Sequence, residues 1–402
     1  MPGSYRDLVW QHDPTLHAPA RYRKACKYRA FVPERLAALE VTLDAATAGA
    51  VSAAESAVAA LNGQAHPALA PLARLLLRTE SIASSKVEGI ALGARALARA
   101  EARMHTGEKV AQTAHEILAN IDAMTLAIDH AVATKTFALA DIVAIHRRLM
   151  HGSATPKVAG VVRGRQNWIG GNDYNPCGAD FVAPPPKELG RLLTDLCRAV
   201  NDDSLPPVVQ AALVHAQFET IHPFADGNGR TGRALIHVVL KRRGLSRAYV
   251  PPISVVLAAK KSGYVTGLTS YRSADVGPWI QRFSDATATS ADLARSYIGA
   301  VDRKVAEWRA ALERHDAPRA GAAAWEVIDV LPAHPMITAP TAIAATRRAR
   351  AAVYQALEQL QHAGVLKPVS NSPRNRVWEA VGLLDLLEGL EGGRPPPKRT
   401  PS

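Results

Sequence analysis

Apolar residues recur at helical spacing through most of this chain of 402 residues. One example is the run Ile117, Ile121, Met124 and Ile128, which falls at i, i+4, i+7 and i+11. Aromatic residues make up only 5% of the sequence and alanine is abundant, which favours close helix packing over sheets of aromatic and β-branched residues. The sequence therefore predicts a mainly α fold.

Length and composition set the broad class of protein. At roughly 150 residues per domain, 402 residues correspond to two or three domains. No apolar stretch approaches the roughly 18 to 20 residues that span a bilayer, and the first residues lack the order of a signal peptide. We therefore expect a cytoplasmic protein with no membrane segment. Lys and Arg number 48 against 36 Asp and Glu, a net charge of +12 that favours anionic partners.

The three cysteines are Cys26, Cys177 and Cys197. Their number is odd and no pair has CxxC spacing, so the sequence indicates neither a disulfide framework nor a zinc ribbon. We expect all three to be reduced thiols.

Residues 160–186 interrupt the helical pattern. They contain two short strand-like runs around a turn rich in Gly, Asn and Asp, followed by three prolines that exclude helix. This segment predicts a β-hairpin.

A second change follows a charged helix expected at about 296–314, where the sequence reads as a linker. Residues 322–390 predict a small domain of three helices and two strands, at 365–366 and 376–378, around a turn at 370–373. This plan indicates a winged helix. After residue 390 the chain is rich in Pro, Gly and charge, which is typical of a loose tail.

The segment that carries chemistry joins two helices. Residues 208–221 predict an amphipathic helix, which Pro223 ends because proline disfavours helical geometry at the residue before it. The loop 224–229 reads FADGNG, and the next helix is expected to start near Arg230. A glycine-rich loop that leads into a helix N-terminus is an anion-binding arrangement.

Charged and titratable residues surround this loop. Arg230 and Arg233 lie three residues apart and add positive charge to the helix start. Asp226 offers an oxygen ligand of the kind that Mg²⁺ uses beside phosphates, and His222 can take up a proton near neutral pH. An alternative is a zinc site, because His215, Glu219 and His222 fall at i, i+4 and i+7. That spacing is not HExxH, and zinc would occupy the histidine that otherwise serves as a base.

The twelve residues from His222 to Arg233 resemble the signature of the Fic family, His-x-Phe-x-Asp/Glu-Gly-Asn-Gly-Arg-x-x-Arg, with no departure. The resemblance also covers FETIHPF, the hairpin with RQNWIGG and FVAPPP, and much of the flanking helices. It implies a Fic-type helical bundle with a β-hairpin flap. The implied domains are an N-terminal helical region (1–105), a catalytic core (106–295), a helix and linker (296–321), a winged-helix domain (322–390) and a disordered tail (391–402).

The resemblance implies a protein adenylyltransferase that moves AMP from ATP to a Tyr, Thr or Ser hydroxyl of a protein. His222 is then the base, Asp226 holds Mg²⁺, and ATP is bound by Phe224, Gly227, Asn228, Gly229, Arg230 and Arg233. Kinase-like relatives carry Asn-Lys where this chain has Asn228-Gly229, which disfavours phosphorylation. Self-modification, a homodimer and removal of AMP by the same site stay open, as does the nucleotide; Tyr264 and Tyr271 are candidates for the walls of its base pocket.

Two further segments gain roles from the resemblance. The flap residues Asn167, Trp168 and Ile169 could pair with an extended target segment, the alternative being a simple covering hairpin. Upstream, the stripe of Ser81, Ser84, Ser85 and Glu88 is either a solvent face or, with Gly89, the family's inhibitory motif Ser/Thr-x-x-x-Glu-Gly/Asn. In the second case Glu88 pairs with Arg233 and displaces the γ-phosphate.

A different class of function is a DNA-binding regulator. Arginines of the predicted winged helix could contact DNA phosphates or form a solvated face; they are Arg347, Arg348, Arg350, Arg374 and Arg376. The glycine usual at a helix-turn-helix corner is absent between Ala345 and Arg350.

Overall fold

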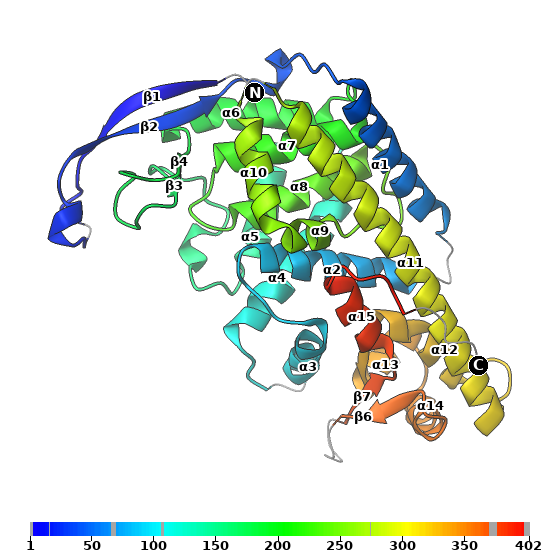
Figure 1. The fold of residues 1–402 in the computed structure, drawn as a ribbon. Coiled ribbons are helices and arrows are strands. Elements are labelled where there is room, and N and C mark those ends of the chain that lie inside the picture. The colour runs from blue at the N-terminus through cyan, green and yellow to red at the C-terminus, as the bar shows by residue number, and fades with distance from the viewer. Residues whose placement is uncertain are drawn as a thin grey trace. The chain divides into compact units, whose positions relative to one another are not determined.

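The computed structural model describes residues 3–15, 17–65, 70–105, 108–273, 275–369 and 376–397. It is mainly α, with three small antiparallel sheets, as the sequence predicts (Figure 1). Among the described residues, no helix has both the length and the apolar character needed to cross a membrane.

The chain divides into two compact units. The first comprises residues 1–55, 122–245 and 261–285, and the second comprises 56–121, 246–260 and 286–402. Three helices contribute residues to both units: α1 (Ala45–Gly63), α4 (Gln112–Ala133) and α11 (Gly277–His315). The charged helix expected at 296–314 is thus the end of a much longer helix.

The first unit is built around two helices, α7 and α8, that pack against each other (Figure 1). α7 is buried along nearly its whole length, and its buried residues include Gln210, His215 and Gln217, so the amphipathic helix expected at 208–221 is wrong: this helix has no solvent face. The elements of this unit are β1 (Gly3–Trp10), β2 (Cys26–Pro33), α5 (Leu139–Leu149), β3 (Trp168–Ile169), β4 (Phe181–Val182), α6 (Pro186–Asn201), α7 (Pro207–Ile221), α8 (Asn228–Arg242) and α10 (Lys261–Tyr271).

β1 and β2 form an antiparallel ribbon, paired from Gly3 opposite Pro33 to Trp10 opposite Cys26. Cys26 is joined by a disulfide to Cys177 in the loop between β3 and β4, with the two Cα atoms 6.3 Å apart. The expectation of three reduced thiols is therefore wrong for this pair. The two residues are 151 positions apart, and only the packing of the ribbon beside the hairpin brings them together. Cys197 is free and buried.

The second unit contains two helices from residues 70–105 and the C-terminal part of the chain. Its elements are α2 (Ala70–Val87), α3 (Ala94–His105), α9 (Ile253–Ala259), α12 (Ala323–Val330), β5 (Met336–Thr338), α13 (Ala339–Thr346), α14 (Arg350–His362), β6 (Leu366–Pro368), β7 (Val377–Ala380) and α15 (Leu383–Glu391). In its three-stranded sheet the order is β5-β7-β6.

The C-terminal part has the three expected helices, α12, α13 and α14, but it also has one strand, β5, and one helix, α15, that were not expected. β5 is only three residues long and runs directly into α13, so its pattern is too short to read from sequence. The predicted turn at 370–373 and Arg374 lie outside the described residues, as do residues 398–402 of the predicted tail. The winged-helix assignment stays a prediction.

Candidate active site

The candidate site begins where α7 ends. His222 follows Ile221 in the left-handed conformation, with φ 49° and ψ 59°, and its N–H donates to the Phe218 carbonyl oxygen at 2.9 Å. A residue other than glycine seldom adopts this conformation unless its surroundings enforce it. The chain therefore turns sharply at His222, whose side chain is half-buried.

The loop ends at Gly227, which caps α8. Gly227 has φ 75°, and a Cβ there would lie 3.0 Å from Met150 Sδ and 3.3 Å from His146 Nε2. α8 starts at Asn228, two residues before the expected start at Arg230, because the left-handed glycine lets the helix begin directly after it. Helix geometry leaves the first N–H groups of α8 without partners inside the helix.

Asn228 closes the loop on itself. Its side-chain oxygen accepts from the Phe224 N–H at 2.9 Å, and its side-chain nitrogen donates to the Phe224 carbonyl oxygen at 2.8 Å. Both polar atoms of this amide are thus engaged within the loop. Phe224 itself is fully buried.

The charged residues of the motif differ sharply in exposure. Arg230 and Arg233 are buried, with 4% and 1% of their surface exposed. Asp226 is exposed, and one of its carboxylate oxygens accepts from the Gly227 N–H at 2.6 Å and lies 3.9 Å from Arg230. The other accepts from the Thr155 hydroxyl at 3.4 Å.

Arg163 supports the motif from the preceding segment, a role that sequence reasoning missed. Its guanidinium donates to the carbonyl oxygens of His222 at 2.7 Å, Pro184 at 2.7 Å and Arg165 at 2.8 Å. Its backbone N–H donates to the Pro223 carbonyl oxygen at 2.9 Å. Burial lowers the pKa of Arg163 to about 10, so it stays charged at neutral pH. This side chain holds the left-handed turn in place.

His146 of α5 is a second support that sequence reasoning missed. Its Nε2–H donates to the Asp226 carbonyl oxygen and its Nδ1 accepts from the Gly160 N–H, both at 2.9 Å. Burial lowers the pKa of this imidazole to about 4, despite the opposing effect of Asp226. The ring is neutral, as its acceptor role at Nδ1 requires.

A weak signal for both supports was present in the sequence. His146 falls on the apolar face of a helix, between Ile145 and Leu149, and Arg163 follows an apolar pair of valines. A polar residue in such a position has to find a buried partner. The sequence does not say which one.

The predicted flap is a hairpin in which Trp168 pairs with Val182 and Ile169 with Phe181. Its sheet has two strands, so among the described residues no strand covers the other edge of β3. Asn167 joins the flap to the motif, because its side-chain nitrogen donates to the Phe224 carbonyl oxygen at 3.0 Å. Ile169 is 47% exposed.

The inhibitory motif lies at the end of α2. Ser81, Ser84 and Ser85 are fully buried, so the solvent-face interpretation is wrong for these serines. The side-chain nitrogen of Asn120 in α4 donates to the Ser85 hydroxyl at 3.0 Å and to the Ser81 carbonyl oxygen at 2.8 Å, which fixes this face of α2. Glu88 is exposed. It belongs to the second unit and Arg233 to the first, and their pairing stays a prediction.

The zinc alternative gains no support from the geometry. His215 is fully buried, and its Nε2 lies 2.9 Å from the Tyr264 hydroxyl. In the described ranges, no three His, Cys, Asp or Glu residues are grouped to hold a metal ion. Tyr264 and Tyr271 are themselves buried, and Tyr271 donates to Gln217 at 3.1 Å, so Tyr271 does not line an open base pocket.

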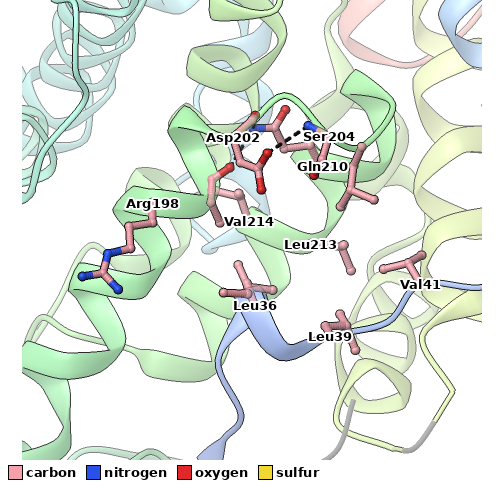
Figure 2. A pocket seen from close by; sticks show the side chains of 12 residues that line it. Leu36, Leu39, Val41, Arg198, Asp202, Ser204, Gln210, Leu213 and Val214 are labelled. Atoms are coloured by element: carbon pink, nitrogen blue, oxygen red, sulfur yellow. Dashed lines mark hydrogen bonds between the residues drawn. The ribbon is translucent and has the colours of Figure 1, made fainter.

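A separate hollow of about 80 Å³ opens between the segment after β2 and helices α6 and α7 (Figure 2). Its walls are mainly apolar, and none of the predicted site residues is among them. The lining residues are Leu36, Ala37, Leu39, Val41, Arg198, Ala199, Asp202, Ser204, Leu205, Gln210, Leu213 and Val214.

The fold and the loop together define a helical protein in which a glycine-rich loop leads into a helix N-terminus, the kind of arrangement that suits an anion, with a histidine at its entrance. Residues 136–240 match the Fic/DOC family, and residues 48–129 match the N-terminal region of that family. Over these two ranges the chain is similar to the Fic/DOC family.

Curated relatives and solved structures are also similar to the chain. The protein adenylyltransferase Fic of Drosophila ananassae is 32% identical over 196 residues, and that of Drosophila melanogaster is 31% identical over the same length. Each match covers 48% of this chain but only 36% and 37% of the relative, so the chain spans little more than a third of their length. A Fic family protein from Desulfovibrio desulfuricans shares the fold, with a TM-score of 0.52 and 20% identity over 85% of this chain and 98% of that one. Fic-1 of C. elegans has a TM-score of 0.51 and 23% sequence identity, over 64% of this chain and 73% of that one.

Proposed function

We propose that this protein is an adenylyltransferase that transfers AMP from ATP to a hydroxyl group of a target protein. The observation that carries the proposal is the left-handed His222, held by Arg163 at the entrance of the helix start that bears Arg230 and Arg233. The names of the Drosophila relatives point to the same activity.

In this reaction the target's hydroxyl oxygen forms a bond to the α-phosphorus of ATP, and the bond from that phosphorus to the bridging oxygen breaks. His222 accepts the hydroxyl proton, and pyrophosphate leaves. Placement and charge neutralisation supply most of the catalysis for phosphorus chemistry of this kind. We assign the neutralisation to Arg230 and Arg233 and the phosphate contacts to the backbone N–H groups of Gly227, Asn228 and Gly229. The Asn228 side chain keeps the loop closed.

Asp226 fits the role of the single carboxylate that holds Mg²⁺ together with substrate phosphates, because it is exposed at the loop that leads into the start of α8. A bound Mg²⁺ would supply further charge neutralisation at the phosphates.

The flap serves the target protein. The free edge of β3 at Trp168 and Ile169 suits an extended target segment, which would add to it as a further strand. Asn167 couples this edge to the motif through the Phe224 carbonyl oxygen, so a docked segment is positioned against the same loop that binds ATP.

Glu88 is the proposed brake. Its carboxylate takes the place of the γ-phosphate at Arg233, so that ATP binds in an unproductive pose and the resting rate is low. Removal of AMP by the same site is the alternative activity.

The test is the incorporation of AMP from ATP labelled at its α-phosphate, into the proteins of a lysate and into the chain itself. His222→Ala should abolish the transfer, Glu88→Gly should raise it, and His151→Ala, at an exposed histidine, should leave it unchanged. Transfer by His222→Ala at the wild-type rate would refute the proposed activity. Equal rates of wild type and Glu88→Gly would refute the brake alone.

The DNA-binding alternative has less support. Arg348 is paired with Glu326 and donates to the Gly321 carbonyl oxygen, and Arg350 lies over the Tyr354 ring, so these arginines already have partners within the chain. A gel shift titrated with salt decides the question: no shift at low salt removes the DNA-binding role.

A further inference from the structure

Arg95, the second residue of α3, is surrounded by three carboxylates from the C-terminal part of the chain. Its guanidinium lies 2.5 Å from Glu379 of β7, and 2.6 Å and 3.2 Å from Asp385 and Glu388 of α15. Glu379 is almost wholly buried, and Lys367 lies 3.0 Å from its carboxylate. A guanidinium held by several carboxylates at a partly buried position resists separation more than a single surface ion pair does.

The same helix α15 also covers the start of α3. The Ala94 N–H donates to a side-chain oxygen of Glu391 at 3.1 Å, which gives an N–H at the helix start an acceptor. α15 packs against both α2 and α3 (Figure 1), and β5 packs against α3. Residues 323–391, here called the C-terminal module, thus hold the beginning of α3 through side chains and backbone.

The inhibitory motif is connected to this point by a short segment. α2 ends at Val87, α3 begins at Ala94, and Glu88 and Gly89 lie between them. Gly89 has φ 82°, and the N–H groups of Glu88 and Ile90 both donate to the Ser85 carbonyl oxygen at 3.1 Å. Further along, Ile90 and Leu92 pack against a buried apolar cluster that includes Ile82 and Leu97. A displacement at the start of α3 is therefore passed on to Glu88 within a few residues.

We infer that Arg95 is a positioning residue through which the C-terminal module holds the inhibitory segment 84–89, so that releasing Arg95 from its carboxylates raises AMP transfer. The inference rests on the proposed function and adds to it a regulatory role for the C-terminal module. Arg95 lies within the range that matches the N-terminal region of the family, whereas residues 323–391 lie outside both matched ranges.

The test uses the full chain and labelled ATP, in wild-type and Glu88→Gly backgrounds. Arg95→Met removes the charge and keeps an apolar side chain, and Arg99→Met, at an exposed position of the same helix, is the matched control. We expect Arg95→Met to raise the initial rate about fivefold or more, the size of an ordinary coupling between sites. Arg99→Met should stay at the wild-type rate. In the Glu88→Gly background, Arg95→Met should add nothing, because the brake is already absent.

A second readout separates release of the segment from general loosening. Hydrogen exchange should become faster in peptides that cover residues 84–94 of Arg95→Met, and should stay unchanged in those of α7 and α8. If Arg95→Met does not fold, the double variant Asp385→Asn, Glu388→Gln is used in its place. It removes the charges of the two more exposed carboxylates that contact Arg95.

The outcomes distinguish the inference from the function on which it rests. A wild-type rate for Arg95→Met beside an activated Glu88→Gly overturns the inference and leaves the proposed function standing. An equal increase in both backgrounds also overturns it, because Arg95 then acts without Glu88. If Glu88→Gly itself has the wild-type rate, the brake fails and the inference falls with it.

Discussion

The imidazole of His146 stacks on the ring of Phe224, with the ring centroids 3.7 Å apart and the planes only 4° from parallel. The same imidazole bonds Asp226 and Gly160, so one side chain of α5 fixes the motif loop by its face and by both nitrogens. The position of the motif loop thus depends on a residue that has no part in the family's signature.

The first prediction concerns acid stability. The native pKa of His146 is about 4 against an ordinary 6.5, so the unfolded state binds the proton more readily. The stability that this group contributes is present above pH 6.5 and is lost as the pH falls toward 4. Between pH 7 and pH 5 we expect a loss of about 2 kcal/mol, which His146→Asn should remove from the pH profile. Urea unfolding at the two pH values measures it, and an unchanged profile in His146→Asn would contradict the assignment.

The second prediction tests Arg163. Arg163→Met leaves the carbonyl oxygens of His222 and Pro184 without their donor, so we expect a loss of roughly 2 to 4 kcal/mol in the free energy of unfolding. AMP transfer should fall as the turn at His222 relaxes. Arg165→Met, at a side chain that is 72% exposed, is the control and should change stability by less than about 0.5 kcal/mol. Thermal unfolding and labelled-ATP transfer are the measurements; equal effects of the two variants would refute the supporting role.

The third prediction compares two helical glycines. A Cβ at Gly232 in α8 would lie 3.0 Å from the buried Phe218 ring of α7 and 2.4 Å from Glu219 Oε1, so Gly232→Ala crowds that ring and displaces the Glu219 carboxylate. We expect a destabilisation of about 1 to 3 kcal/mol. At the exposed Gly190 in α6 an added Cβ meets no atom within 4 Å, and Gly190→Ala should stabilise by up to about 1 kcal/mol. Denaturant unfolding gives both values, and the same sign for both would contradict the packing argument.

The fourth prediction concerns Glu391. Burial raises its pKa to about 7, against the opposing effects of the Ala94 N–H and of Arg78 and Lys86, while Glu388 acts in the same direction as burial. The native state therefore binds the proton more readily than the unfolded state. The stability this group contributes is fully present below about pH 4.5 and is lost as the pH rises through 7.

Replacing Glu391 by Gln removes this titration. As the pH rises from 5 to 7.5, the free energy of unfolding should fall by about 1 to 2 kcal/mol more in wild type than in Glu391→Gln. This figure allows for solvent screening, because the side chain is partly exposed. Glu358→Gln, at an exposed position of α14, serves as the control. Thermal unfolding across this range gives the comparison, and parallel profiles of wild type and Glu391→Gln would show that Glu391 titrates normally.

The sequence alone determined the mainly α class, the helix that ends before Pro223 and the loop that leads into the next helix. These features follow from neighbours within a few residues of each other, where helical spacing, proline and left-handed glycine act through local geometry. Such local rules also located the hairpin and the three helices of the C-terminal part.

Only the tertiary structure decided what holds these parts in place. Arg163 bonds a residue 59 positions away, His146 one that is 80 away, and Arg95 reaches Glu379 across 284 positions. Two further features also depend on contacts between distant parts of the chain: the disulfide between Cys26 and Cys177, and the burial of Ser84 and Ser85. Contacts at such separations depend on how whole helices and strands pack, and local residue patterns carry no record of which distant surface a side chain will meet.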